Sequence, residues 1–315
     1  MGALRRLEGA GLHLCVHPGP VRTRQLSVFQ LFAGCVLIWG STWYAIKFQL
    51  GHVAPEASVF YRFLLASMLL FAYCHIRKLP LRYTLKEHVW IALFGIFMFS
   101  TSYIFVYYAE EHVVSGLVAV GYSASPLLGM LGMRIFFGTA MTLRVALGAA
   151  LGILGIALVF WPEFSRIRGD GNTGLGAAYT AMAVLLSTFG SMVAHRNQEA
   201  KLPLWQGMAW GMLYGAIFSL GVALATGRTL AFDASPAYVL SLLYLAIAGS
   251  ILAFACFLTL LKRVGAARAG YTGVMIPIVA LLMSATFEAF RWQALTVAGV
   301  VVSIAGNVII LRGRK

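Results

Sequence analysis

Aromatic and hydroxyl side chains gather on several long apolar segments of this chain, where they could bind a small molecule. Tyr and Trp each offer a flat apolar face and one polar donor, which suits stacking against a planar or zwitterionic ligand. The candidate binding residues are Trp39, Ser41, Trp43, Tyr103, Tyr122, Ser123, Trp210, Tyr214, Tyr271 and Thr272. Aromatic residues nearer to segment ends, such as Tyr44, Tyr107 and Trp161, are expected to anchor the chain at a boundary between lipid and water.

Two basic residues, Lys47 and Arg62, stand inside apolar segments, where an unpaired charge costs about 2.5 to 3.5 kcal/mol at the centre of a membrane. Arg62 is a further candidate binding residue. Each of the two could bind the carboxylate of a ligand or pair with Glu110 or Glu288, or could extend its long side chain to the membrane surface. No Asp or Glu stands in the middle of an apolar segment, which disfavours a lipophilic cation as ligand.

Pro126 and Pro277 occupy corresponding places in two of the apolar segments. A proline inside a helix lacks one hydrogen bond and clashes with the preceding turn, so each is predicted to act as a kink or hinge that frees carbonyl groups towards the interior. Paired interruptions of this kind point to a binding site near the middle of the membrane. The alternative is that the two prolines only shape the packing of the helices.

The sequence offers no pattern for catalysis or for a cofactor. The seven histidines show no HExxH spacing, and neither a Walker loop nor a GxSxG elbow occurs. The four cysteines are too scattered for a disulfide framework or a metal site. Neighbouring residues on a helix point in different directions, so the run Glu110-Glu111-His112 is expected to be a solvated outer loop. The sequence therefore predicts no enzyme, no metal and no cofactor.

Composition places the chain in lipid. Hydrophobic residues make up 60% of it and charged residues 11%, and the mean hydropathy is +0.84. A helix needs roughly 20 apolar residues to cross the hydrocarbon core. The sequence predicts an all-α integral membrane protein with about ten transmembrane helices, at residues 28–48, 57–76, 88–107, 113–133, 143–161, 174–194, 204–226, 237–261, 264–287 and 294–311.

Basic residues accumulate in every second gap between these segments, and this pattern accounts for the net charge of +14. The positive-inside rule then places both termini in the cytoplasm, with 18 of the 24 basic residues on that side. The excess charge suits contact with anionic lipid rather than with nucleic acid, since no basic and aromatic patch stands outside the membrane. Residues 1–27 are expected to be a cytoplasmic tail, without the small-residue cleavage site of a signal peptide.

The second half of the chain is similar to the first. A shift of 151 residues places Pro126 on Pro277, Gly148 on Gly299 and Gly155 on Gly306, and a shift of 150 places Gly40-Ser41 on Gly190-Ser191. Two repeats of five helices are predicted, at 28–161 and 174–311. Because five is odd, the second repeat must enter the membrane from the opposite side, which is the inverted architecture of many secondary transporters. The small residues of the two closing segments could pack within the bundle or form a homodimer interface.

Several segments resemble the EamA-like branch of the drug/metabolite transporter superfamily, in their order and spacing over about nine-tenths of the chain. These segments are Trp39-Gly40-Ser41-Thr42-Trp43, Tyr61-Arg62-Phe63-Leu64-Leu65-Ala66, Ser125-Pro126-Leu127, the run from Lys262 to Gly270, Ile276-Pro277, and the closing spans Gly148 to Trp161 and Gly299 to Arg312. The resemblance implies a ten-helix carrier that moves small metabolites, often amino acids or related compounds, outward across the cytoplasmic membrane. The run Glu110-Glu111-His112 departs from the family pattern.

The sequence thus predicts a multi-pass carrier in the cell's inner membrane that exports neutral or zwitterionic metabolites by alternating access. A broad-specificity drug exporter and an integral membrane enzyme acting on lipid are the alternatives. Proton coupling and facilitated movement both stay open, as does a homodimer.

Overall fold

The computed structural model describes residues 26–138, 143–166, 172–269 and 271–312. Within these ranges the chain forms helices and short connections, and no β-strand occurs in them. Seven helical segments of the described chain are long and apolar enough to cross a membrane, and three shorter apolar helices complete the bundle. The all-α membrane fold predicted from the sequence is therefore confirmed.

The first half of the described chain crosses the bundle five times. Its elements are α1 (Val28–Ile46), the 3-10 turn η1 (Lys47–Gln49), α2 (Pro55–Ile76), α3 (Leu85–Ile96), the π-helical η2 (Phe97–Thr101), α4 (Ser102–Glu110), α5 (Ser115–Gly121), the 3-10 turn η3 (Tyr122–Ala124), α6 (Ser125–Phe137) and α7 (Leu143–Arg166). Ser27 with Gln30 and Thr84 with Glu87 form capping boxes that start α1 and α3. These caps satisfy the free N–H groups of the first turns.

The second half repeats this order in the opposite direction. Its elements are α8 (Asn172–Glu199), α9 (Leu204–Ala225), α10 (Pro236–Tyr244), the π-helical η4 (Leu245–Leu252), α11 (Ala253–Ala269), α12 (Tyr271–Phe287) and α13 (Ala294–Arg312).

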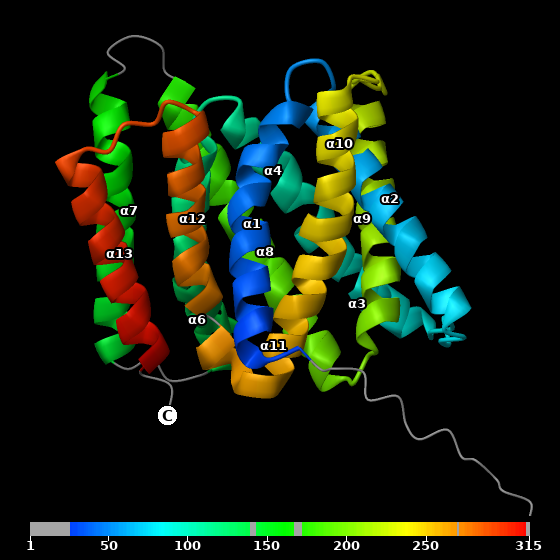
Figure 1. Cartoon of the computed structure of the whole chain (residues 1–315). Helices are drawn as coiled ribbons and strands as arrows, with labels where there is room; N and C mark the ends of the chain where they lie inside the picture. The colour runs from blue at the N-terminus through cyan, green and yellow to red at the C-terminus, as the bar shows by residue number, and fades with distance from the viewer. Residues whose placement is uncertain (1–25, 139–142, 167–171, 270, 313–315) are drawn as a thin grey trace, which may run out of the picture.

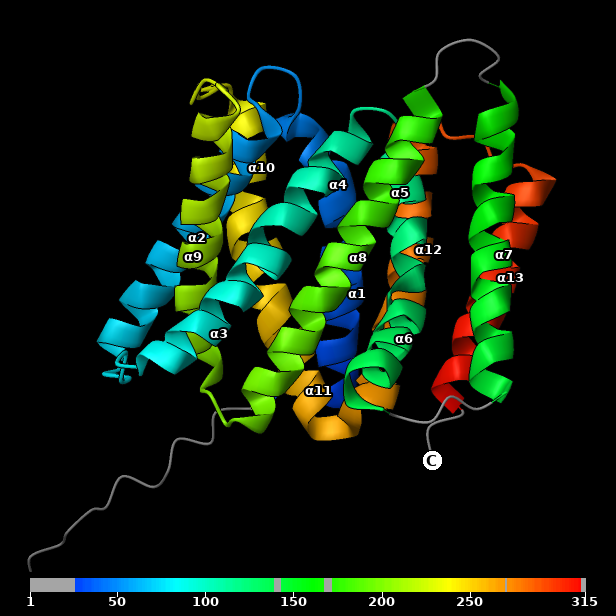
Figure 2. The same cartoon turned by 180° about the vertical axis from the view of Figure 1, so that it is seen from behind.

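The first and the last described residues of the chain lie at the same end of the bundle. We call this end the terminal end, and we call the opposite end the far end. Helix α1 runs away from the terminal end and α8 runs towards it, as Figures 1 and 2 show. The two repeats are therefore inverted.

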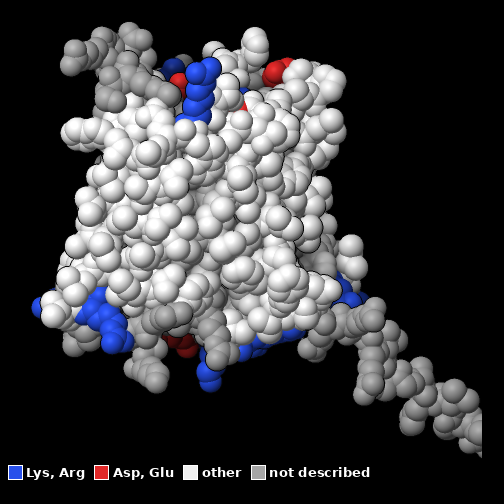
Figure 3. Space-filling model, turned by 60° about the vertical axis from the view of Figure 1, so that its left-hand side comes forward, with Lys and Arg blue, Asp and Glu red and all other residues white. Residues whose placement is uncertain are grey.

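Charged side chains lie at the two ends of the bundle. Figure 3 shows a broad band without charge, with most of the visible Lys and Arg at the terminal end. The exposed basic residues there include Arg77, Lys86, Arg134, Lys201 and Lys262. The uncharged band is the surface that lipid covers in a spanning protein.

The two halves interlock through their first and third crossings. Helix α1 packs on η4 and α11, and α8 packs in the same way on α3, η2 and α4. Both third crossings contain a π-helical segment at matching places of the repeat. Thr101 and Ser250 each donate a hydroxyl to the carbonyl five residues earlier, at 2.9 Å. Such π-helical insertions are frequent at functional sites.

The closing helices α7 and α13 contact each other through glycines. A Cβ atom on Gly155 would lie 2.4 Å from the backbone nitrogen of Ser303, and one on Gly299 would lie 2.6 Å from the carbonyl oxygen of Gly155. The small-residue faces therefore pack on each other within one chain, as small residues do in membrane helices. A homodimer stays a prediction.

We expect Gly155→Ala to destabilise the protein by about 1 to 3 kcal/mol, because the added methyl group would overlap the backbone of α13. Gly152→Ala is the matched control on the same helix, since a Cβ atom there meets nothing within 4 Å. Size-exclusion chromatography of the purified variants after heating measures the midpoint of thermal unfolding. Equal midpoints for the two variants would contradict the glycine contact.

Candidate functional site

A cavity of about 380 Å³ opens at the terminal end, between α3, α6, α8, α9 and α11. Leu202 and Pro203, in the connection between α8 and α9, lie at its mouth, and Met98 and Phe254 lie at its inner end. Its polar lining residues are Ser125, Thr188, Ser191, His195, Asn197 and Gln198, and its thioethers are those of Met98, Met130, Met192 and Met208. None of the described lining residues is Asp, Glu, Lys or Arg. The cavity suits a ligand without net charge, and its thioethers adapt to irregular shapes.

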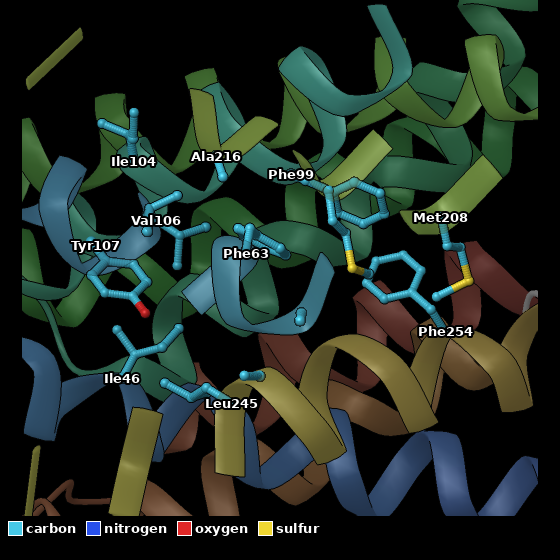
Figure 4. Packing of buried hydrophobic residues seen from close by; sticks show 14 of the residues in the cluster. Ile46, Phe63, Phe99, Ile104, Val106, Tyr107, Met208, Ala216, Leu245 and Phe254 are labelled. Carbon is cyan, nitrogen blue, oxygen red and sulfur yellow. The ribbon is translucent and has the colours of Figure 1, made fainter. Parts of the chain in front are cut away.

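A layer of aromatic rings closes the inner end of this cavity. The ring centroids of Phe99 and Phe254 lie 5.2 Å apart, those of Phe63 and Phe99 lie 5.3 Å apart, and Trp39 contacts Phe254 at 5.0 Å. In Figure 4, Met208, Phe254 and Phe99 lie on one side of the cluster, Tyr107 lies on the other, and Phe63 lies between them. The layer separates the cavity from a second, closed group of polar side chains.

Arg62 is the cation of that closed group. It is only 1% exposed, and its Nε donates to the Ser250 hydroxyl of η4 at 3.1 Å. Its guanidinium carbon lies 4.5 Å from the centre of the Tyr103 ring. The Nη1 atom has no hydrogen-bond partner, and no carboxylate of the described residues forms an ion pair with Arg62. The side chain does not reach the membrane surface, so it is a buried charge with a free donor.

Glu110 is the acidic residue of the closed group. It is 4% exposed, and neither of its carboxylate oxygens has a partner. It lies within electrostatic range of Arg62, Lys47 and Glu288. The expectation of a solvated outer loop is therefore wrong for Glu110, because α4 carries this residue into the bundle before the chain turns.

Tyr107 is fully buried, and its hydroxyl group is close to Arg62. The expectation that Tyr107 is an interfacial anchor is therefore wrong. The Trp43 Nε1 atom, on α1, is also buried without a partner. The closed group thus holds the polar atoms of Arg62, Glu110, Tyr107 and Trp43 inside the bundle.

The far end of the bundle is closed by an ion pair. Lys47 Nζ lies 3.0 Å from Glu288 Oε1, which confirms one of the pairings considered for Lys47. The Ser115 hydroxyl donates to Glu288 at 2.6 Å, and Ser284 donates to the same carboxylate. These contacts join η1, α5 and the end of α12. We call these four residues the far-end latch.

Four of the predicted site residues come together in the closed group. Arg62 lies over the Tyr103 ring, and the rings of Trp43 and Tyr122 have their centroids 5.0 Å apart. A fifth, Trp39, lies beside the group, and its indole donates to the carbonyl of Gly249 at 3.1 Å. None of the predicted site residues is among the described residues that line the open cavity.

Trp210 and Tyr214 lie elsewhere, at the terminal end. The Trp210 indole donates to the Leu81 carbonyl at 3.1 Å, and the Tyr214 hydroxyl contacts His88 Nδ1 at 2.8 Å. Trp210 thus attaches the connection between α2 and α3 to α9, and Tyr214 attaches the start of α3 to α9. Burial also raises the pKa of Tyr83, in this connection, to about 12.

The remaining predicted residues make contacts outside the closed group. Ser41 bonds with the Tyr244 hydroxyl, Ser123 with Ser303, and Thr272 with the Ala269 carbonyl, whereas Tyr271 is half-buried. Pro277 lies inside the continuous helix α12. Pro126 is the second residue of α6, directly after η3, where a missing N–H group is tolerated. Only the crossing of Pro126 is therefore interrupted beside its proline, by the 3-10 turn η3.

The predicted residues do not include the polar face of α8 that lines the cavity. Thr188, Ser191, His195 and Gln198 follow one another at intervals of three or four residues. This spacing places them on one face of a helix. A polar stripe along an otherwise apolar helix is the signal in the sequence that indicates such a lining.

Comparison with known proteins gives one consistent result. A model of the EamA-like transporter family matches residues 26–161 and, again, residues 174–312. The "uncharacterized inner membrane transporter YedA" of Escherichia coli strain K12 is 30% identical over 297 residues, which cover 88% of this chain and 90% of that protein. An "uncharacterized transporter" of Archaeoglobus fulgidus is 25% identical, over 89% of this chain and 96% of its own. A solved crystal structure with 16% identity has the same fold, with a TM-score of 0.66 over 91% of this chain and 98% of that chain.

The position of the cavity predicts which introduced cysteines a thiol reagent can reach. In a variant without native cysteines, Ser191→Cys should react with a membrane-impermeant thiol reagent applied at the terminal end, because Ser191 is exposed in the cavity. Ser123→Cys is the control, since Ser123 is buried behind the cavity against Ser303. Mass spectrometry after labelling of right-side-out and inverted vesicles measures the difference. Reaction of Ser191→Cys from the far end alone would contradict the assigned opening.

Proposed function

We propose that this chain, which belongs to the EamA-like transporter family, exports small neutral or zwitterionic metabolites, such as amino acids, across a cell's inner membrane by alternating access. The observation that carries the proposal is the uncharged cavity, open at one end of an inverted-repeat bundle and closed at the other. Carriers with inverted repeats hold their substrate between the two halves and open alternately to each side.

The distribution of charge supports the proposed direction of transport. Basic residues are concentrated at the terminal end, which favours a cytoplasmic location of that end under the positive-inside rule. The cavity then faces the cytoplasm, where an exporter loads its substrate. The relative from Escherichia coli is named as an inner membrane transporter, which supports the proposed location.

The lining of the cavity favours one second candidate, a broad-specificity exporter of apolar drugs. Four methionine side chains line the cavity, and methionine suits surfaces that bind ligands of varied shape. The absence of a charged group among the described lining residues disfavours cationic drugs, since a cation in lipid needs an acidic partner. An enzyme acting on lipid is the less favoured alternative, and turnover of a lipid without movement of solute would identify it.

A counterflow experiment tests the proposed function. Purified protein is placed in liposomes that contain an unlabelled amino acid, and entry of the labelled form is followed for each standard amino acid in turn. At least one should accumulate transiently above the level in liposomes without protein. No counterflow for any amino acid, together with uptake of apolar dyes, would favour the drug exporter.

Gly207→Leu should slow this counterflow by about tenfold or more, because a pocket contact worth one methylene group already changes rates by about 10 to 200-fold. Gly207 lines the cavity, and a Cβ atom there meets nothing within 4 Å, so the new side chain fills the cavity without disturbing the fold. Gly221→Leu is the matched control on the same helix, with equally open space and no place in the cavity lining. Equal rates for both variants would contradict a passage through this cavity.

A further inference from the structure

A hollow of about 530 Å³ lies on the closing helices, and none of its described lining residues borders the open cavity. Leu143, Leu147 and Leu154 of α7 line it, and their spacing places them on one face of the helix. The other lining residues are Arg144, Ala150, Leu151 and, on α13, Ile309. The three leucines are 76%, 56% and 51% exposed, so the described chain leaves this face uncovered.

Helix α7 packs on α13 through a different face. A Cβ atom on Gly306 would lie 2.5 Å from the carbonyl oxygen of Gly148, and one on Gly299 would lie 2.6 Å from that of Gly155. The two helices are therefore antiparallel. Because α13 ends at the terminal end of the bundle, α7 begins there, and Arg144 in its first turn lies at that end.

The hollow extends over about one leaflet of a membrane. From Leu143 to Leu154 the helix advances by eleven residues, which is about 16.5 Å at a rise of about 1.5 Å per residue. The hydrocarbon core of a membrane is about 30 Å thick. The hollow thus begins at the terminal end and covers about half of the core, which is the depth that an acyl chain occupies in its own leaflet.

Arg144 supplies a positive charge at the terminal end of the hollow. Its side chain is exposed, and no carboxylate of the described residues forms an ion pair with it. Figure 3, in which the side of α7 and α13 comes forward, shows basic side chains at the terminal end of the uncharged band. A guanidinium binds a phosphate through two parallel hydrogen bonds. The hollow therefore combines an apolar wall inside the membrane with a phosphate-binding group at its surface.

We propose that this hollow binds an anionic phospholipid, with one acyl chain along the leucine face of α7 and the phosphate at Arg144. A head with net negative charge is favoured, because the ammonium group of a zwitterionic head already compensates the phosphate. Basic residues near a membrane surface attract anionic lipids in the same way. The inference goes beyond the proposed function, since it concerns a surface outside the cavity and holds for any cargo.

A second copy of the chain fits this face less well. Two copies in the same orientation would be related by a twofold axis along the membrane normal, and the same face of each would form the interface. Such a pairing would place Arg144 of one copy at the same depth as Arg144 of the other. Like charges that face each other across an interface weaken association. An anionic lipid instead neutralises Arg144.

Photo-crosslinking in vesicles of known composition tests the site. The photoreactive residue p-benzoylphenylalanine replaces Leu147, one turn from Arg144, in the full-length protein. The vesicles contain phosphatidylglycerol and phosphatidylcholine in equal amounts, and mass spectrometry after irradiation measures the ratio of the two lipid adducts. The control carries the same group at Ile153, which is 58% exposed on the same helix and does not line the hollow. The ratio at position 147 should favour phosphatidylglycerol about fivefold more than the ratio at position 153, the size expected for one basic residue near anionic lipid.

Variants of Arg144 test the source of this preference. Arg144→Gln should lower the ratio at position 147 to the ratio at position 153, because the charge that selects the head is lost. Arg144→Lys keeps the charge and should keep most of the preference. Arg77→Gln is the matched control and should leave the ratio unchanged, since Arg77 is also exposed at the terminal end but does not line the hollow.

Three results would overturn the lipid site. Equal ratios at positions 147 and 153 without any change at Arg144 would show that the hollow does not select its lipid. A preference that persists in Arg144→Gln would show that this residue does not bind the head. Adducts of twice the protein mass at position 147 would show that a second copy of the chain covers the face.

Discussion

A helix that is interrupted inside lipid must find partners for the backbone groups that the interruption releases. In this protein the third crossing of each half is interrupted by a π-helical segment, and the first crossing of the other half covers it. Trp39 donates to the Gly249 carbonyl at 3.1 Å, and Gly190 lies against Met98, where a Cβ atom would be 2.9 Å from the Met98 nitrogen. The same segments supply Ser250 to Arg62 and Met98 to the cavity. The π-helical segments that join the two halves therefore also contribute residues to the closed group and to the cavity.

The two ends of an inverted repeat are equivalent in backbone but not in side chains. A shift of 150 residues places Lys47 on Asn197, and the shift of 151 that places Pro126 on Pro277 places Glu288 on Phe137. The ion pair of the far-end latch thus has no counterpart at the matching positions of the terminal end. Asn197 instead lines the open cavity. The asymmetry of these side chains explains why the bundle is closed at the far end and open at the terminal end.

The ten apolar segments and the duplication could be predicted from the sequence, because hydropathy and odd-numbered repeats leave few alternatives in lipid. Trp43, Arg62, Tyr103 and Tyr122 were recognisable as unusual residues in apolar surroundings, and the fold brings them together. Trp210 looks equally suitable in sequence, yet its indole holds the connection between α2 and α3. Sequence gives the depth of a residue in the membrane, but the direction in which it points depends on how the helices are arranged.

Glu110 and Tyr107 show a second reason why sequence falls short. Both lie near the end of a predicted span, which indicates a place at the membrane surface. In the fold, however, α4 is covered by its neighbours up to Glu110, and both residues are buried. The π-helical segments are also hidden in sequence, because one extra residue in a helical turn leaves no mark in an apolar run.

The central claim is that the two ends open alternately around one buried site. Pulsed electron paramagnetic resonance between spin labels measures this most directly, with one pair at Gln198 and Lys262 of the terminal end and another at His52 and Arg291 of the far end, all four exposed. On addition of a transported amino acid, the account predicts a shorter distance for the first pair and a longer distance for the second. Distances that stay unchanged at both ends, or that lengthen at both, would contradict it.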